Sequence, residues 1–295
     1  MQHTSDQALI LQVDKFGDHD AIVHFFTETH GLNRGVVKGG LGSKRRAELQ
    51  PASLVEAQWK SRLPEHLSSL TVDGAVSFGA RVMHDPLRLA AVGSAMGLLG
   101  AVLAERDPHP ELFHHSVDFL RHVAAGVEKL IWLSEYVRLE LALLASAGFG
   151  LDLTQCAATG ATDELIYVSP KSGRAVCRVA GAPYHGKMLA LPAFLVPEMA
   201  AVIPSPPGGG LGWGLPQTPY SKSAPHLTSP QEGEGLQRQA LPDALTAHLA
   251  DSFTEIRDGL ALTGHFIEAR MLPDLHRKPP PLRAHFVALV GRFAG

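Results

Sequence analysis

The first 80 residues of the chain contain five short runs rich in β-branched and aromatic residues, at 8–13, 21–27, 32–38, 53–59 and 67–78. Turn residues separate these runs, which is the pattern of successive short strands. A sheet of short strands must satisfy its edges, and closing the sheet on itself does so. The pattern therefore predicts a small closed barrel. The OB-fold is the common five-stranded solution, and an SH3-like barrel fits the strand pattern as well.

The pattern changes near Asp85-Pro86, where alanine and leucine become dominant. Helical spacing then predicts helices at 87–105, 111–125 and 129–147, one or two more over 241–272, and a last one at 283–293. Between them, residues 151–185 read as a loop and hairpin with strands at 165–168 and 175–179. We expect an α+β protein with a barrel domain at 1–80 and a helical domain at 81–295.

Residues 204–236 differ in composition from the rest of the predicted helical domain. Proline and glycine open this stretch, and glycine and glutamate close it. Such a composition buries too little apolar surface to offset the entropy of the chain. We therefore predict a disordered insertion between two helices.

The net charge of the whole chain is −3, so any surface for a polyanion must be local. One such cluster lies between residues 34 and 46, which carry five basic side chains and no acid: Arg34, Lys38, Lys44, Arg45 and Arg46. Glycines among them free the backbone to follow a partner closely. The stretch predicts a strand that runs into a mobile basic loop and contacts phosphates. A solvated loop without a ligand is the alternative.

Four aromatic residues of the barrel region are candidates for stacking on bases: Phe16, Phe25, Phe26 and Trp59. The alternative is that they belong to the core, because stacking needs an exposed ring. Phe25 and Phe26 are neighbours in a strand and must face opposite sides of the sheet.

Signs of catalysis or metal binding are few. His114, Asp118 and His122 are spaced four apart and share one helix face, which suits a metal site or an ordinary polar face. Cys156 and Cys177 flank the predicted hairpin, but a structural zinc site needs four ligands. We expect no catalytic residues and no cofactor. The N-terminus lacks the basic start and apolar run of a signal peptide, and no apolar run is long enough to span a membrane, which predicts a cytoplasmic protein.

Several motifs taken in order resemble the RecO family of recombination mediators. In the barrel region they lie at 16–23, 26–27, 30–32, 37–39 and 49–51. Further on they lie at 110–113, 138–144, 148–153 with Cys156, 167–170 with Gly173 and Cys177, and 260–266.

The resemblance implies an OB-fold followed by a helical domain, in a bacterial, nucleoid-associated protein without catalytic activity. It implies binding to single- and double-stranded DNA, annealing of complementary strands, and loading of RecA onto strands coated with single-strand-binding protein. RecR and the C-terminal tail of single-strand-binding protein are the implied partners. The family's DNA-binding positions carry over onto Arg34, Lys38 and residues 44–46.

The resemblance also implies a zinc hairpin built from two Cys-x-x-Cys pairs. Here Thr159 and Ala180 replace the second cysteine of each pair. Cys156 and Cys177 are then the remnants of a four-cysteine site, and zinc is not expected.

Three other functions fit parts of the sequence. One is a generic OB-fold module that binds RNA. The second is a metal-dependent hydrolase that uses His114, Asp118 and His122. The third is a scaffold whose basic loop contacts an acidic protein.

Overall fold

The computed structural model describes residues 2–61, 67–196 and 243–292. The predicted insertion at 204–236 lies outside them. The first domain is a closed barrel of five strands in the order β1-β2-β3-β5-β4. The strands are β1 Gln2–Phe16, β2 Asp20–Thr27, β3 Gly31–Val37, β4 Ser53–Ser61 and β5 Ser68–Ser77. Only the β3–β5 contact is parallel among the described barrel pairs. The structure confirms the predicted OB-type barrel.

The interior of the barrel explains the alternating pattern of β2. Ala21, Val23 and Phe25 point inward and join a core that includes Trp59 and Leu70. The rings of Phe25 and Trp59 meet edge to face with their centroids 5.2 Å apart. Both side chains are buried, which supports the core alternative for them and excludes stacking on bases.

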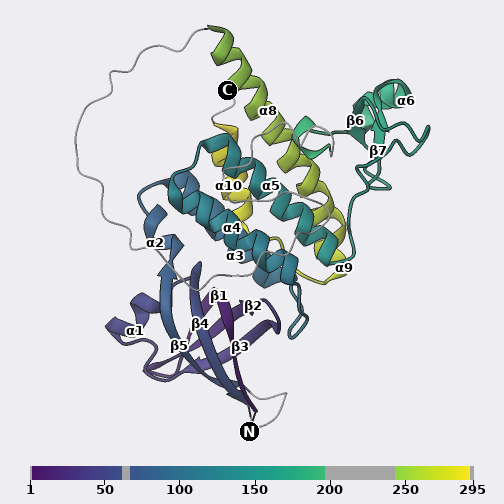
Figure 1. The fold of residues 1–295 in the computed structure, drawn as a ribbon. Helices are drawn as coiled ribbons and strands as arrows, with labels where there is room; N and C mark the ends of the chain where they lie inside the picture. Colours follow the sequence, from purple (N-terminus) through teal and green to yellow (C-terminus); the bar gives the residue numbers. More distant parts are fainter. Residues whose placement is uncertain (1, 62–66, 197–242, 293–295) are drawn as a thin grey trace, which may run out of the picture.

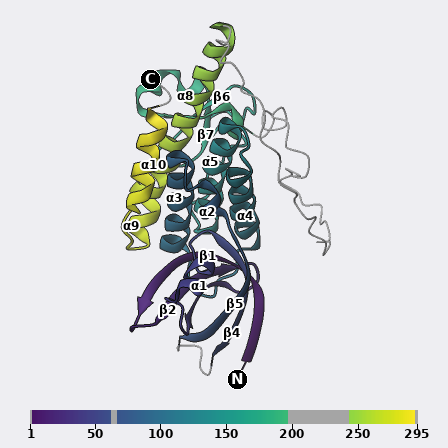
Figure 2. The ribbon, with the colours of Figure 1, turned by 90° about the vertical axis from the view of Figure 1, so that its left-hand side faces the viewer.

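The second domain is a group of helices that stands on one end of the barrel (Figures 1 and 2). Its helices are α2 Phe78–Val82, α3 Pro86–Val102, α4 Pro110–Ala125, α5 Lys129–Ser146, α8 Asp243–Phe266, α9 Leu272–Asp274 and α10 Pro281–Gly291, with a π-helical turn η3 at Ile267–Met271. Asp85 caps α3, because its carboxylate accepts the backbone N–H groups of Leu87 and Arg88. None of the described helices is both long and apolar enough to cross a bilayer.

A small hairpin module projects from the helices (Figure 1). It contains β6 Leu165–Val168, β7 Ala175–Cys177, β8 Leu189–Ala190, α6 Arg178–Gly181, and the 3-10 turns η1 Ala182–Lys187 and η2 Ala193–Leu195. The side chains of His265 and Arg270 bond to the carbonyl oxygen of Pro170 in the hairpin turn. These bonds fasten the turn to α8 and η3.

Apolar residues on the outer side of the barrel wall join the core of the helices, which is distinct from the core inside the barrel. Phe26 turns away from the barrel interior and meets Phe113 of α4, with ring centroids 5.5 Å apart. It is therefore buried as completely as Phe25 and cannot stack on a base. The loop between α3 and α4 pairs with the edge of β3, where the N–H of Arg106 donates to the carbonyl of Leu32 at 2.9 Å.

The chain at this junction admits only glycine at position 31. Gly31 has φ +66, and a Cβ there would lie 2.2 Å from the carbonyl oxygen of Asp107. The loop after α3 therefore lies directly against the start of β3.

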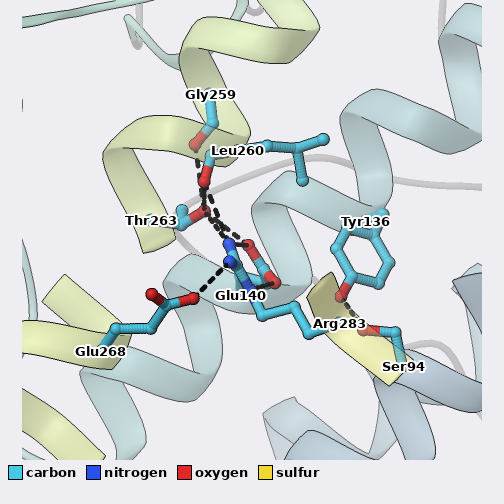
Figure 3. A network of polar contacts seen from close by, with 8 residues as sticks. All are labelled: Ser94, Tyr136, Glu140, Gly259, Leu260, Thr263, Glu268 and Arg283. Carbon is cyan, nitrogen blue, oxygen red and sulfur yellow. Dashed lines mark hydrogen bonds and ion pairs between the residues drawn. The ribbon is translucent and has the colours of Figure 1, made fainter. Parts of the chain in front are cut away.

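A buried ion pair ties the C-terminal helix to the rest of the domain (Figure 3). The Arg283 guanidinium on α10 donates to both carboxylate oxygens of Glu140 on α5, at 2.7 and 3.0 Å. It also donates to the carbonyl of Leu260, while the Thr263 hydroxyl donates to Glu140. Burial lowers the pKa of Arg283, but the Glu140 carboxylate outweighs it and raises that pKa above its usual range. The guanidinium therefore stays charged in spite of its burial.

The backbone of α8 leaves space for this guanidinium. A Cβ at Gly264 would lie 2.9 Å from a nitrogen of Arg283. Any other residue there would displace the guanidinium from its present contacts.

We predict that Arg283→Ala costs about 3–5 kcal/mol of unfolding free energy, because Glu140 would stay buried without its partner. The double variant Glu140→Met with Arg283→Met should be markedly more stable than the single variant, since it leaves no buried charge. Urea denaturation followed by circular dichroism measures both. A cost below about 1 kcal/mol for the single variant would contradict the role given to the pair.

Candidate nucleic-acid interface

The outer face of β1, β2 and β3 carries the first predicted cation. Residues directly opposite each other in paired strands share a face, and the register places Gln12, His24 and Arg34 in one row. Arg34 is exposed, but its Nε lies 2.6 Å from Oε1 of Glu105. Glu105 belongs to the loop that follows α3, so the helical domain supplies the carboxylate that pairs with this barrel residue.

The second predicted cation, Lys38, directly follows β3. The turn after it is held by the N–H of Gly39, which donates to the Asp20 carboxylate at 2.8 Å. Lys38 is exposed, and no ion pair within the described part of the chain involves it. Its ammonium group is available to a ligand.

Residues 44–46 lie in a short helix, α1 Ser43–Glu48, which corrects the prediction of a mobile loop. Leu49, directly after the helix, is buried in the barrel core and Leu41, just before it, packs against that core. The two leucines hold the helix against the barrel, a constraint that the count of basic residues did not reveal.

The cations of α1 differ in their surroundings. Arg45 donates to the carbonyl of Val72 on β5 at 3.1 Å and pairs with Glu48 at 3.2 Å. It therefore anchors the helix. Arg46 is exposed and takes part in no ion pair among the described side chains. The side chain of Lys44 lies outside the described part of the structure.

Acidic groups lie among these cations. A carboxylate oxygen of Asp14 on β1 lies 3.2 Å from Nε2 of His24. The Asp20 carboxylate accepts the N–H of Gly39, and the Glu105 carboxylate pairs with Arg34. The barrel surface is thus mixed in charge. Within the predicted basic stretch, Lys38 and Arg46 are the cations outside ion pairs among the described side chains, and the exposed Lys15 and Lys60 elsewhere on the barrel are also outside them. A surface of this kind attracts a polyanion through few contacts, and salt weakens such contacts.

The structure separates the three residues proposed as metal ligands. His114 pairs with Glu28 of the barrel at 3.1 Å, and His122 pairs with Glu135 of α5 at 2.8 Å. Asp118 pairs with Arg121. In the described ranges, no group of three histidine, cysteine or acidic side chains is arranged to hold a metal ion. Of the two interpretations of this helix face, these contacts support the ordinary polar face and not the metal site.

Cys156 and Cys177 are both buried in the hairpin module as free thiols. The N–H of Cys177 donates to Sγ of Cys156 at 3.3 Å. The Thr159 hydroxyl lies 3.7 Å from Sγ of Cys177. Ala180 offers no donor, and the nearby His185 is exposed with its Nδ1 at the carbonyl of Ala182. Two thiols and one hydroxyl do not make the four-ligand set of a structural zinc site.

Among the four aromatic candidates, Phe16 alone is exposed, at the end of β1 and beside the turn to β2. Glu105 and His24 belong to the surface as well, and sequence reasoning missed both. The alternation of β2 could have indicated that His24 points outward. Nothing near Glu105 in the sequence signals its contact with Arg34.

Comparisons with known proteins cover most of the chain. Residues 1–77 match a family model described as "Recombination protein O N terminal", and residues 83–201 match "Recombination protein O C terminal". Three similar proteins are each named DNA repair protein RecO. The one from Rhodospirillum rubrum is 42% identical over 79% of this chain and 91% of its own length. Those from Rhodospirillum centenum and Methylocella silvestris are 35% and 40% identical, over 96% and 83% of this chain and 92% and 94% of their own lengths.

Proposed function

Because the chain belongs to the RecO family of DNA repair proteins, we propose that it is a non-catalytic recombination mediator that binds single- and double-stranded DNA. The family assigns it a role in DNA repair, and no catalytic family matches. The proposed steps are annealing of complementary strands and assistance in placing RecA on single strands.

One observation carries the proposal. Four exposed cations of the OB-type barrel stand outside ion pairs among the described side chains: Lys15 on β1, Lys38 after β3, Arg46 on α1 and Lys60 on β4. Lys38 and Arg46 are the two that belong to the predicted basic stretch. OB barrels bind oligonucleotides on the face of strands 2 and 3 and on the loops beside it, and Lys38 directly follows β3. Each phosphate that a lysine or arginine neutralises releases counterions, which supplies binding free energy.

Arg34 would join this surface when a phosphate replaces Glu105. Both side chains are about half exposed, at 46% and 44%, so water screens their ion pair and the pair is weak. A phosphate can compete with such a carboxylate. Arg34 would then contact DNA only when a phosphate displaces Glu105, and this competition would lower the affinity of the surface for DNA.

Annealing follows from the same electrostatics. Two complementary strands repel each other through their phosphates, and a protein that neutralises some of them lowers that repulsion. The mixed charge of the barrel keeps each contact weak, so a strand can shift its register before pairing. No covalent step is needed.

The helical domain is the proposed docking site for RecR and for the C-terminal tail of single-strand-binding protein. Family membership supports these partners. Through them the protein would act on single strands coated with that protein and favour loading of RecA. A cytoplasmic, nucleoid-associated location goes with this role.

We predict that the double variant Lys38→Ala with Arg46→Ala lowers affinity for a single-stranded oligonucleotide several-fold. The slope of log affinity against log salt should fall by about 1.4, because two phosphate contacts are lost. Fluorescence anisotropy across a salt series measures both.

The matched control is Lys171→Ala with Lys187→Ala, which removes the same charge from the hairpin module. If both double variants weaken binding equally, the effect is one of net charge and the barrel assignment fails. Equal loss of binding to a matched RNA oligomer would favour a generic RNA module instead.

We predict that Glu105→Gln strengthens DNA binding several-fold, since it frees Arg34 and adds about 0.7 to the salt slope on single strands. The gain should vanish in Glu105→Gln with Arg34→Ala. Glu164→Gln, which releases Arg178 on the hairpin, removes the same charge and serves as control. A gain in the control as large as that of Glu105→Gln would refute the local mechanism.

We predict that the unaltered protein with RecR speeds duplex formation between complementary strands coated with single-strand-binding protein. Strands coated with a variant lacking its C-terminal tail should show no such acceleration. Native gel electrophoresis of labelled strands follows the reaction. If the tail makes no difference, the proposed partner is wrong, although DNA binding by the barrel would stand.

A further inference from the structure

The hairpin module brings two cysteines together, one from the loop before β6 and one from the end of β7. Cys156 precedes β6, and Cys177 is the last residue of β7. The backbone N–H of Cys177 donates to Sγ of Cys156 at 3.3 Å. The Thr159 hydroxyl bonds to Cys156 and lies 3.7 Å from Sγ of Cys177. One hydroxyl thus contacts both sulfurs.

The side chains around these sulfurs do not supply the ligands of the zinc ion that a four-cysteine hairpin would hold. Thr159 and Ala180 stand where two further thiolates would be required. Around the described thiols no third histidine, cysteine or acidic side chain joins them as a ligand. The two cysteines nevertheless lie in contact, and zinc binding does not account for that contact.

We propose that Cys156 and Cys177 form a reversible intramolecular disulfide when the protein meets a hydroperoxide. The Cys156 thiolate attacks one peroxide oxygen, the O–O bond breaks, and a proton completes the departing water. The resulting sulfenic acid then reacts with the Cys177 thiol. A sulfur–sulfur bond forms and a second water leaves, so two thiols and one hydrogen peroxide give one disulfide and two waters.

The geometry suits this bond. A disulfide joins residues whose Cα atoms are about 4.4–6.8 Å apart. The 3.3 Å contact between Sγ of Cys156 and the backbone nitrogen of Cys177 already brings one sulfur to the other residue's backbone. The Thr159 hydroxyl, 3.7 Å from Sγ of Cys177, lies in the same small cluster.

The surroundings of Cys156 favour the reactive thiolate. Burial raises its pKa, but hydrogen bonds from the Thr159 hydroxyl and from the N–H groups of Cys177, Ala158 and Thr159 outweigh burial and lower the pKa to about 6. At neutral pH the thiolate therefore predominates, and the thiolate is the form that peroxides oxidise.

The two cysteines are 2% and 7% exposed, so their oxidation requires a local opening of the segments beside them. Those segments lie at the surface: residues 157–160 after Cys156 are exposed, and so are Arg178 and Val179 after Cys177. The module that contains them projects from the helical body (Figure 1). Once formed, the cross-link would constrain the loop from 156 to 177, as a metal would.

The test treats the reduced full-length protein with hydrogen peroxide and measures its intact mass under denaturing conditions. We expect a monomer lighter by two hydrogen atoms, with no thiol left to alkylate. Peptide mapping should show Cys156 linked to Cys177, and dithiothreitol should restore both thiols. Cys156→Ser and Cys177→Ser should each abolish the internal link.

A second pair of variants tests the role of the shared hydroxyl. Thr159→Val should slow disulfide formation several-fold at pH 7, because the Cys156 thiolate loses a donor and its pKa rises. Thr159→Ser, which keeps the hydroxyl, should react at the rate of the unaltered protein.

Three results would overturn the proposal. They are oxidation of each cysteine to a sulfinic acid without a link, disulfides only between chains, and one zinc ion per purified chain that protects both thiols. Each of these results leaves the DNA-binding role untouched, because neither cysteine lies on the barrel.

Discussion

Two adjacent phenylalanines on β2 determine how the two domains are joined. Since neighbouring residues of a strand face opposite sides, Phe25 enters the barrel core while Phe26 enters the core of the helices. The barrel wall is therefore buried on both sides at this point. Contact between Phe26 and Phe113, together with the pairing of β3 with the α3–α4 loop, fixes the orientation of the helices on the barrel.

That orientation controls the electrostatics of the barrel surface. The loop that pairs with β3 carries Glu105 to Arg34, so the junction between the domains also neutralises one barrel cation. An overall charge of −3 and acids among the basic residues leave a surface that depends on a few cations. A DNA-binding site with so few cations would be weak and sensitive to salt, which suits the proposed role of handing strands to another protein.

The helical domain shows how polar groups are accommodated inside an apolar core. Arg283, Glu140 and Thr263 satisfy one another across three helices, and Gly264 leaves the space that the guanidinium needs. The hairpin module has no such buried ion pair among its described residues. Its strands bury apolar side chains such as Leu165 and Val168, and its described residues form no complete metal site. Its two thiols are held near each other by the backbone itself.

The sequence by itself determined the order of the elements. Strand alternation and helical spacing are local, so the five strands, the helices α3 to α5 and the hairpin lie close to where the pattern predicted them. The motifs that resemble the family are also short local stretches, so their order along the chain could be seen in the sequence alone. Only the tertiary structure decided which side chains are available, because partners far apart in the sequence occupy them. Arg34 pairs with Glu105, Arg45 donates to the backbone carbonyl of Val72, and Trp59 is buried in the barrel core. No local pattern encodes such contacts, since they arise only when the domains pack.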